Sequence, residues 1–193
     1  LDGKIATARG ESQWITGEPA RAYGMELRRD ADAILVGINT ILADDPRLTW
    51  RTPQTATRHP KMLRRIVLDS QARTPLQARI VSDAQAVLTT IVVSRQAPRK
   101  RVAALAQRVR VLVAPLKKSV PHSFRTALDL RWLLRRLGAE NITHLLVEGG
   151  GEVNASFLLQ RLAHRVAFFY APKILGGRDA RKAVGGEGAR TLT

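Results

Sequence analysis

Cysteine is absent from the 193 residues, and this absence excludes several classes of protein. Without cysteine the chain has no disulfide, no thiolate nucleophile and no cysteine-ligated zinc or iron–sulfur centre. The four histidines stand far apart without metal-ligand spacing, so we expect structural or surface roles for them and no metal site. A chain of this length can bury a sizeable core without such cross-links.

Long apolar runs and aromatic residues are scarce as well. No run approaches the ~20 residues that a membrane helix needs, and residues 1–4 do not lead into the apolar region of a signal peptide. Aromatic residues make up 5% of the chain, too few for the stacking platforms of proteins that bind single-stranded nucleic acid. We therefore expect a cytoplasmic protein that binds neither a membrane nor nucleic acid.

Acidic residues are outnumbered, because 32 lysines and arginines stand against 16 aspartates and glutamates and leave a net charge of +16. Such a positive field attracts phosphates, nucleotides or nucleic acid, although a solubilising basic surface explains the charge equally well. The sequence has no long uninterrupted run of Lys or Arg of the kind found in nucleic-acid-binding tails. The charge thus indicates anionic ligands without naming one.

Short apolar runs alternate with helical patterns along the chain. The runs are rich in β-branched residues or leucine, which predicts buried strands over 33–37, 65–69, 90–94, 109–113, 144–148 and 166–171. Helices are predicted over 18–29, 98–105 and 130–137, with a short one after Gly37 and a last one after Gly151. We expect an α/β domain whose largely parallel sheet is covered by helices on both faces.

Two further local patterns complete the predicted organisation. Thr126 and Asp129 resemble the capping box of the helix that follows them. The polar stretches 51–64 and 115–123 are predicted surface loops rather than domain linkers. We expect one domain over residues 1–193, trimmed at both ends, because no strand leads into the first residues and the glycine-rich tail stops without a closing strand.

Three consecutive glycines, Gly149 to Gly151, stand between a predicted strand and a predicted helix. Glycines there let a phosphate approach the backbone, and the N–H groups that begin the helix bind anions. A tight turn is the alternative, but it needs fewer glycines. Glu148 precedes them at the carboxyl end of a strand, where α/β sheets bind ligands, although a solvated strand end is equally compatible with the sequence.

Two other segments carry unusual combinations of residues. The Asp44-Asp45-Pro46 turn follows a short predicted helix; adjacent carboxylates can bind metal, but without a nearby histidine a simple turn is the stronger interpretation. Trp14 lies in a polar loop, where it could pack on a flat ring or cover the core.

Six segments stand in one order along nearly the whole chain: LDGKIA (1–6), GESQWIT (10–16), LADDPRLT (42–49), VLDS (67–70), VEGGG (147–151) and APKILGG (171–177). Together they resemble the reductase domain of the bacterial bifunctional riboflavin-biosynthesis deaminase–reductase. The resemblance implies a dihydrofolate-reductase-like fold with a mostly parallel central sheet flanked by helices. It also implies a homodimer, and in the full-length protein an N-terminal zinc deaminase whose motif residues 1–193 do not contain.

The resemblance further implies the reaction. NADPH would reduce the phosphorylated pyrimidine 5-amino-6-(5-phosphoribosylamino)uracil to its 5-phosphoribitylamino product, with hydride going to the ribosyl C1′. A sister reductase of the same fold acting on another pyrimidine or a pterin is the main alternative. A basic nucleic-acid-binding module is a weaker one, because it leaves the glycine turn and the Asp-Asp-Pro motif unexplained.

The resemblance also assigns residues, position by position. The substrate contacts it implies are Ser12, Arg28, Leu48, Arg51 and Glu148. The cofactor contacts it implies are Trp14, Thr40, Asp44, Ser70, Gly150, Gly151, Glu152, Val153, Asn154, Ala155 and Ser156. The catalytic candidates are Lys4, Asp44 and Glu148, the first two for proton handling near C1′.

Physical chemistry agrees with several of these roles. Arg28 and Arg51 suit a 5′-phosphate, because guanidinium groups bind phosphate through charge-assisted hydrogen bonds. Ser70, with Arg73 close by in the sequence, suits the 2′-phosphate of the cofactor. We therefore expect NADPH to be preferred over NADH.

Overall fold

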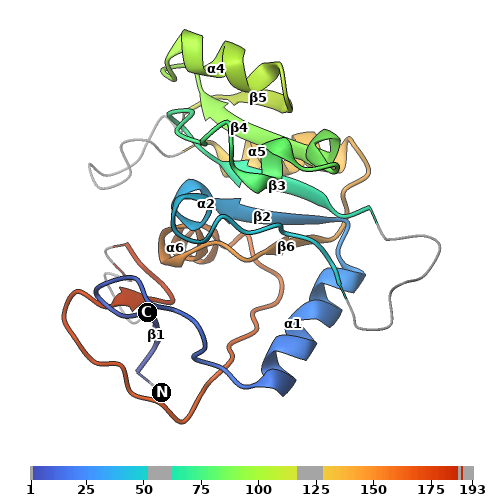
Figure 1. The fold of residues 1–193 in the computed structure, drawn as a ribbon. Coiled ribbons are helices and arrows are strands. Elements are labelled where there is room, and N and C mark those ends of the chain that lie inside the picture. Colours follow the sequence, from blue (N-terminus) through green and yellow to red (C-terminus); the bar gives the residue numbers. More distant parts are fainter. Residues whose placement is uncertain (1, 52–61, 117–127, 187, 189–193) are drawn as a thin grey trace.

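The central feature of the computed structural model is a five-stranded parallel sheet (Figure 1). Residues 2–51, 62–116, 128–186 and 188 are described. In spatial order the strands are β5 (Arg110–Ala114), β4 (Thr89–Ser94), β3 (Arg64–Leu68), β2 (Ala33–Gly37) and β6 (Leu145–Val147). The predicted α/β class and parallel sheet are confirmed. No helix in the described ranges is long and apolar enough to cross a membrane.

Helices cover both faces of this sheet. One face packs against α2 (Ile38–Asp44), α3 (Arg79–Ser82) and α4 (Arg99–Ala106), and the other against α5 (Leu130–Gly138) and α6 (Gly151–Leu159). The 3₁₀ helix η1 (Ala86–Leu88) leads into β4. Helix α1 (Glu18–Asp30) lies off the β6 side of the sheet (Figure 1).

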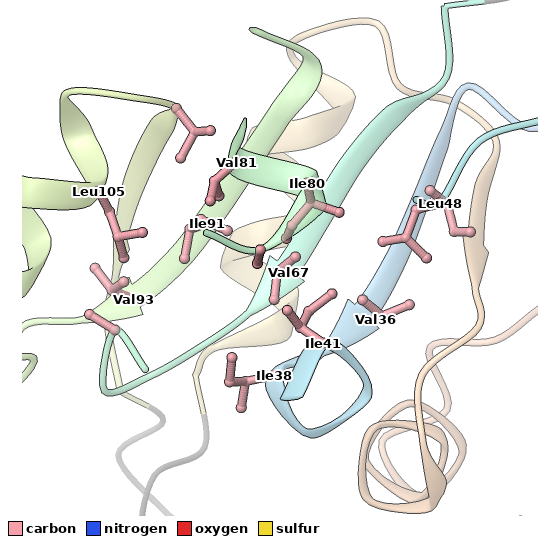
Figure 2. Close-up of a cluster of buried hydrophobic side chains, with 14 of the residues drawn as sticks. Val36, Ile38, Ile41, Leu48, Val67, Ile80, Val81, Ile91, Val93 and Leu105 are labelled. Atoms are coloured by element: carbon pink, nitrogen blue, oxygen red, sulfur yellow. The ribbon is translucent and has the colours of Figure 1, made fainter. Parts of the chain in front are cut away.

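Two hydrophobic cores result, and β2 contributes to both. Its alternate residues divide between them: Ile34 and Val36 enter the cluster drawn in Figure 2, whereas Ala33 and Leu35 enter the one under α5. Side chains of successive strand residues point to opposite faces, so a strand covered on both faces is apolar throughout. Fully burying each branched aliphatic side chain contributes roughly 1.5–3 kcal/mol.

The two ends of the described chain form a separate unit. Strand β1 (Lys4–Ala6) pairs antiparallel with β7 (Arg181–Lys182), away from the main sheet (Figure 1). Residues near positions 4 and 182 therefore lie side by side although they are far apart in sequence.

The predicted strand over 166–171 is wrong. These residues form no strand in the described chain, and Val166, Phe168 and Tyr170 are all more than half exposed. The apolar run by itself indicates a strand only if a neighbouring strand satisfies its backbone and a core receives its side chains. Here Phe169 instead makes an edge-on contact with Tyr23 of α1, at 5.9 Å between ring centroids.

Two aspartates at the ends of predicted elements bind the backbone that follows them. Asp69 follows β3 rather than ending it, since its carboxylate accepts from the N–H and hydroxyl of Thr74, both at 2.7 Å. Asp129 is itself the N-cap of α5, accepting from the Trp132 N–H at 2.9 Å. Its predicted capping partner Thr126 lies outside the described residues, as do residues 52–61 and 117–123 of the two predicted loops.

Candidate functional site

The carboxyl ends of the parallel strands meet at one edge of the sheet, where α/β proteins bind ligands. At this edge β2 runs into α2, β3 into the turn that begins at Asp69, and β6 into Glu148 and the glycine turn. Many of the residues predicted for the cofactor lie on these three connections. The sheet topology, rather than their sequence separation, brings them together.

The glycine turn is shaped by close packing. A Cβ on Gly149 would overlap the side chain of Val153, and one on Gly37 would lie 2.8 Å from it. Gly150 is the N-cap of α6, without a capping side chain among the described residues, and stands against Thr40, whose hydroxyl would be 3.9 Å from a Cβ there. Only Gly150 has free space beside it, because a Cβ on Gly151 would overlap the Lys182 carbonyl. The uncapped helix start at Gly150 fits the diphosphate of a dinucleotide.

Other residues of the stretch 150–156 bind the C-terminal tail of the described chain, at residues 183–186, rather than an open site. Glu152 accepts a hydrogen bond from the Gly186 N–H at 3.0 Å, and the Asn154 amide donates to the Ala183 carbonyl at 2.9 Å. Gly151 also contacts this tail, because its carbonyl accepts from the Gly185 N–H at 2.9 Å.

Of the remaining three members of the stretch, Val153 and Ala155 face the protein, and Ser156 bonds within its own helix. Val153 packs under the glycines, Ala155 is fully buried, and the Ser156 hydroxyl donates to the Glu152 carbonyl within the helix. Of residues 150–156, the backbone at the helix start is thus the part best placed for a ligand.

The connections after β2 and β3 are joined to each other. Arg73 donates to the side-chain oxygen of Asn39 at 2.8 Å, and Asn39 precedes Thr40 in α2. The Ser70 carbonyl accepts from both the N–H and the hydroxyl of Ser94, at 3.1 and 2.8 Å. Gly150, Thr40, Arg73 and Ser70 therefore lie on neighbouring connections of one edge.

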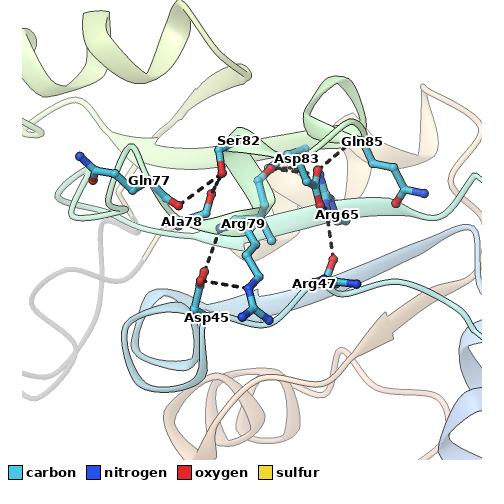
Figure 3. Close-up of polar contacts among 11 residues, drawn as sticks. Asp45, Arg47, Arg65, Gln77, Ala78, Arg79, Ser82, Asp83 and Gln85 are labelled. Carbon is cyan, nitrogen blue, oxygen red and sulfur yellow. Dashed lines mark hydrogen bonds and ion pairs between the residues drawn. The ribbon is translucent and has the colours of Figure 1, made fainter.

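Asp44 and Ser12 are brought to one cavity of about 260 Å³, lined by residues 10–13 and Asp44. The neighbouring Asp45 has a different task. It ends α2 in the left-handed conformation, and its carboxylate accepts from the Arg79 N–H that begins α3, at 2.8 Å (Figure 3). Asp44 thus lines the cavity, whereas Asp45 connects the end of α2 to the start of α3. Within the described ranges no cluster of His, Asp or Glu could hold a metal ion.

Trp14 is exposed over 64% of its surface, and its ring carries the Arg21 guanidinium at 4.6 Å from the ring centroid. Its carbonyl accepts from the Lys173 ammonium at 2.8 Å. The predicted alternatives were a flat-ring platform and a cover over the core. The exposure contradicts the second.

Arg28 and Glu148 form a bidentate ion pair, with Nε–Oε1 at 2.8 Å and Nη2–Oε2 at 2.6 Å. The remaining nitrogen, Nη1, donates to the Thr49 carbonyl at 3.0 Å. Their side chains are 15% and 28% exposed. Two residues predicted to contact different parts of a substrate therefore neutralise each other across α1 and β6.

The other predicted substrate and catalytic residues lie elsewhere. Leu48 is buried in the core and has a positive φ of 51°, so the structure does not expose it to a ligand. Lys4 belongs to the β1–β7 unit, where its ammonium donates to the Ala180 carbonyl at 3.4 Å. Arg51 lines a second cavity together with Arg47 and Arg79.

The sequence analysis missed a buried arginine at the start of β3. Arg65 is 0% exposed and forms a bidentate pair with Asp83, at 2.7 and 2.8 Å (Figure 3). It also donates to Thr89 Oγ1 and to the carbonyls of Ile80 and Arg47. Its hydrogen bonds hold the pKa of the Asp83 carboxyl below its usual value. The signal in the sequence is an arginine beginning an otherwise apolar strand, which a charged strand end also explains.

Comparison with known proteins identifies the family. The family of the RibD C-terminal domain matches residues 1–193. A 2,5-diamino-6-ribosylamino-4(3H)-pyrimidinone 5′-phosphate reductase of Methanothermobacter thermautotrophicus is 46% identical, covering 97% of this chain and 81% of that protein. The riboflavin biosynthesis protein RibD of Actinobacillus pleuropneumoniae is 40% identical over 99% of this chain but 48% of its own length. The chain thus spans about half of the curated RibD relatives it matches.

Solved structures agree on the fold. Acinetobacter baumannii RibD superposes with a TM-score of 0.65 at 24% identity, covering 97% of this chain and 47% of that one. A riboflavin biosynthesis reductase of Saccharomyces cerevisiae gives 0.59 at 24% identity, with coverages of 83% and 63%. The predicted dihydrofolate-reductase-like fold is confirmed, and the reductase names among the relatives support an oxidoreductase. The chain belongs to the RibD C-terminal domain family.

Proposed function

We propose that this domain uses NADPH to reduce the ribosyl group of 5-amino-6-(5-phosphoribosylamino)uracil to the ribityl group in riboflavin biosynthesis. The observation that carries the proposal is the carboxyl edge of the sheet, where Glu148 is followed by the glycine turn and the uncapped start of α6 at Gly150. Family membership supports the same reaction class.

Different residues at this edge bind different parts of the cofactor in this proposal. The backbone at Gly150 and Gly151, with Thr40 beside it, holds the diphosphate. Ser70 and Arg73, on the next connection, hold the 2′-phosphate. When bound, NADPH supplies the hydride that reduces C1′.

Glu148 and Asp44 face the substrate in this proposal. Arg28 fixes both carboxylate oxygens of Glu148, which orients them to accept an N–H of the pyrimidine ring. Asp44 shares its cavity with Ser12 and is the better placed group for moving a proton near C1′. Lys4, whose ammonium contacts Ala180, is the weaker of the two.

The M. thermautotrophicus relative favours a second substrate. That relative is named as a reductase of 2,5-diamino-6-ribosylamino-4(3H)-pyrimidinone 5′-phosphate, and this chain covers 81% of it at 46% identity. The two substrates differ at ring position 2, where one carries an amino donor and the other a carbonyl acceptor. A carboxylate such as Glu148 pairs with the amino group and is repelled by the carbonyl, so the choice depends on which ring edge it meets.

One experiment tests both candidates. Each of the two phosphoribosylamino-pyrimidines is supplied with NADPH, and the oxidation of NADPH is followed by the loss of its absorbance. A parallel series uses NADH in place of NADPH. Faster turnover of the uracil substrate supports the first candidate, whereas faster turnover of the diaminopyrimidinone supports the second. If neither substrate is reduced, both candidates are wrong.

We propose in addition that the domain forms a homodimer and that a deaminase domain precedes it in the full-length protein. The exposed aromatic side chains of Phe168, Phe169 and Tyr170 support an apolar contact between copies. The coverage of about half of each RibD relative supports the additional domain. A monomer mass by light scattering would contradict the dimer.

A further inference from the structure

Asp69 is a carboxylate that the proposed reaction does not use, although it follows β3 directly at the carboxyl edge of the sheet. It is 0% exposed, as is Thr74. Its Oδ2 accepts from both the N–H and the hydroxyl of Thr74, each at 2.7 Å, whereas its Oδ1 is buried without a hydrogen-bond partner among the described residues. Burying an oxygen without a donor is costly, so Asp69 contributes to this turn through the two bonds that Oδ2 makes.

These two bonds form a clamp that closes the turn 69–74 from the inside, and we call them the Asp69–Thr74 clamp. Within the turn Ala72 is fully buried and has a positive φ of 54°, a conformation that residues other than glycine rarely adopt. Its N–H donates to the Asp69 carbonyl at 3.0 Å. A backbone in this conformation persists only while the contacts around it fix it, and the clamp is the innermost of those contacts.

Two residues of the turn face outward, Ser70, which is half-buried, and Arg73, which is exposed. Arg73 stands directly before Thr74, so the clamp fixes where the Arg73 side chain leaves the backbone. Its Nη2 donates to the side-chain oxygen of Asn39 at 2.8 Å. Because the Asn39 amide is neutral, this bond orients the guanidinium group and leaves its charge available to an anion.

Neighbouring elements hold the outside of the turn. Ser94, the last residue of β4, donates its N–H and its hydroxyl to the Ser70 carbonyl. Arg101 of α4 donates to the carbonyls of Ala72 and Thr74. Arg101 is exposed, so water competes for its bonds, whereas the clamp is shielded from solvent. Loss of the clamp therefore leaves the turn with weaker, outer contacts.

We propose that Asp69 and Thr74 are positioning residues that set the preference for NADPH over NADH, because they hold the turn in the shape that presents Ser70 and Arg73. The inference rests on the proposed function, in which Ser70 and Arg73 hold the 2′-phosphate. Both positioning residues are fully buried, so they act through the turn rather than by touching the cofactor. Their effect falls on the difference between the two cofactors, since only NADPH carries the 2′-phosphate.

Fluorescence titration with NADPH and NADH, without substrate, measures the ratio of the two dissociation constants. We expect Asp69→Ala to lower the preference for NADPH about tenfold, the loss of one charge-assisted contact at Arg73. Asp69→Asn should keep the preference or raise it, because the amide oxygen still accepts both donors of Thr74 and the side chain carries no charge. Calorimetric titration with adenosine 2′,5′-bisphosphate and with AMP repeats the comparison on ligands without nicotinamide.

Leu133→Ala is the control for lost stability, because Leu133 lies in the core under α5 on the other face of the sheet. It should destabilise the protein and leave the ratio unchanged. If Asp69→Ala does not fold, Thr74→Val supplies the comparison, since it removes only the hydroxyl bond. We expect Thr74→Val to lower the preference about threefold and Thr74→Ser, which keeps the hydroxyl, to restore it.

The outcomes separate this inference from the proposed function. An unchanged preference in Asp69→Ala and Thr74→Val, an equal change in Leu133→Ala, or a loss in Asp69→Asn as large as in Asp69→Ala would overturn the role of the clamp and leave NADPH as the cofactor. Equal affinity of the unmodified protein for NADPH and NADH would instead remove the 2′-phosphate assignment of the proposed function, and this inference with it.

Discussion

Two arginine–carboxylate pairs hold the same segment of the chain from different sides. Arg65 pairs with Asp83 and donates to the Arg47 carbonyl, whereas Arg28 pairs with Glu148 and donates to the Thr49 carbonyl. Both pairs are bidentate, so their local chemistry is nearly identical.

Their surroundings differ. Arg65 is fully buried and also bonds Thr89 and Ile80, while the Arg28–Glu148 pair keeps part of its surface in solvent beside the glycine turn. A buried pair costs desolvation of both ions and is strongly destabilising to break, whereas a partly exposed one can exchange partners with a ligand. The comparison teaches that burial, not pairing geometry, separates the structural arginine from the one at the proposed active site.

Removing the buried arginine should have the largest effect. We expect Arg65→Met to lower the free energy of unfolding by about 3–5 kcal/mol, because Asp83 loses its partner and Thr89 Oγ1 and the Arg47 carbonyl lose their donor. Urea denaturation measures the change. The double variant with Asp83→Leu should recover part of it, and a loss under about 1 kcal/mol in the single variant would remove the distinction from Arg28.

Changing the exposed pair should affect activity more than stability. Glu148→Gln keeps the size of the side chain but turns an acceptor into a donor, which leaves a pyrimidine N–H facing another donor. An unpaired buried group costs about 1–3 kcal/mol, so kcat/KM should fall by roughly tenfold to a hundredfold while NADPH binding stays normal.

Glu26→Gln, an exposed position on α1, is the matched control for this change. Near-normal turnover in the Glu148 variant would leave Glu148 with its ion pair to Arg28 and no role in binding the pyrimidine. Loss of NADPH binding would place its carboxylate in the cofactor half of the site.

The third change addresses the cofactor side of the edge. Arg73→Gln should weaken NADPH binding about tenfold and leave NADH binding unchanged, because only NADPH carries the 2′-phosphate that we propose this guanidinium binds. Fluorescence titration with both cofactors measures the ratio, and Arg99→Gln at the start of α4 is the control. Equal losses for the two cofactors would exclude a role for Arg73 in 2′-phosphate recognition.

The smallest effect is expected from pH. The pKa of Asp83 is lowered by its hydrogen bonds with Arg65, so its folded pKa lies below its unfolded one. The resulting stability is present above the unfolded pKa of about 4 and is lost as pH falls through the folded pKa.

We expect the free energy of unfolding to decline below about pH 4, by at most about 1.4 kcal/mol per pH unit from this one group. Asp83→Asn should be less stable at neutral pH but flatter in acid. An equally steep acid decline in this variant would assign the decline to other carboxylates, such as Glu140, whose pKa is lowered by its hydrogen bonds with Arg110.

Local patterns in the sequence were sufficient for the main elements. The five buried strands, the start of α1 at Glu18 and the glycine turn were predicted, and α6 begins at Gly151, one residue before the predicted start. Alternation, helical spacing and glycine runs express preferences of neighbouring residues, which is why the sequence shows them. The connection of these elements into a ligand edge followed from the parallel sheet.

Only the tertiary structure decided which residues meet. Arg28 and Glu148 are 120 positions apart in the sequence. The residues around each of them do not show that the two form an ion pair with each other rather than each binding a substrate. From the sequence, Arg65 is compatible with a charged strand end. Only the structure shows that it is buried and donates to the carbonyls of Ile80 and Arg47. The apolar run 166–171 has the composition of a strand, but a strand requires a neighbouring backbone, and that neighbour is a property of the fold rather than of the run.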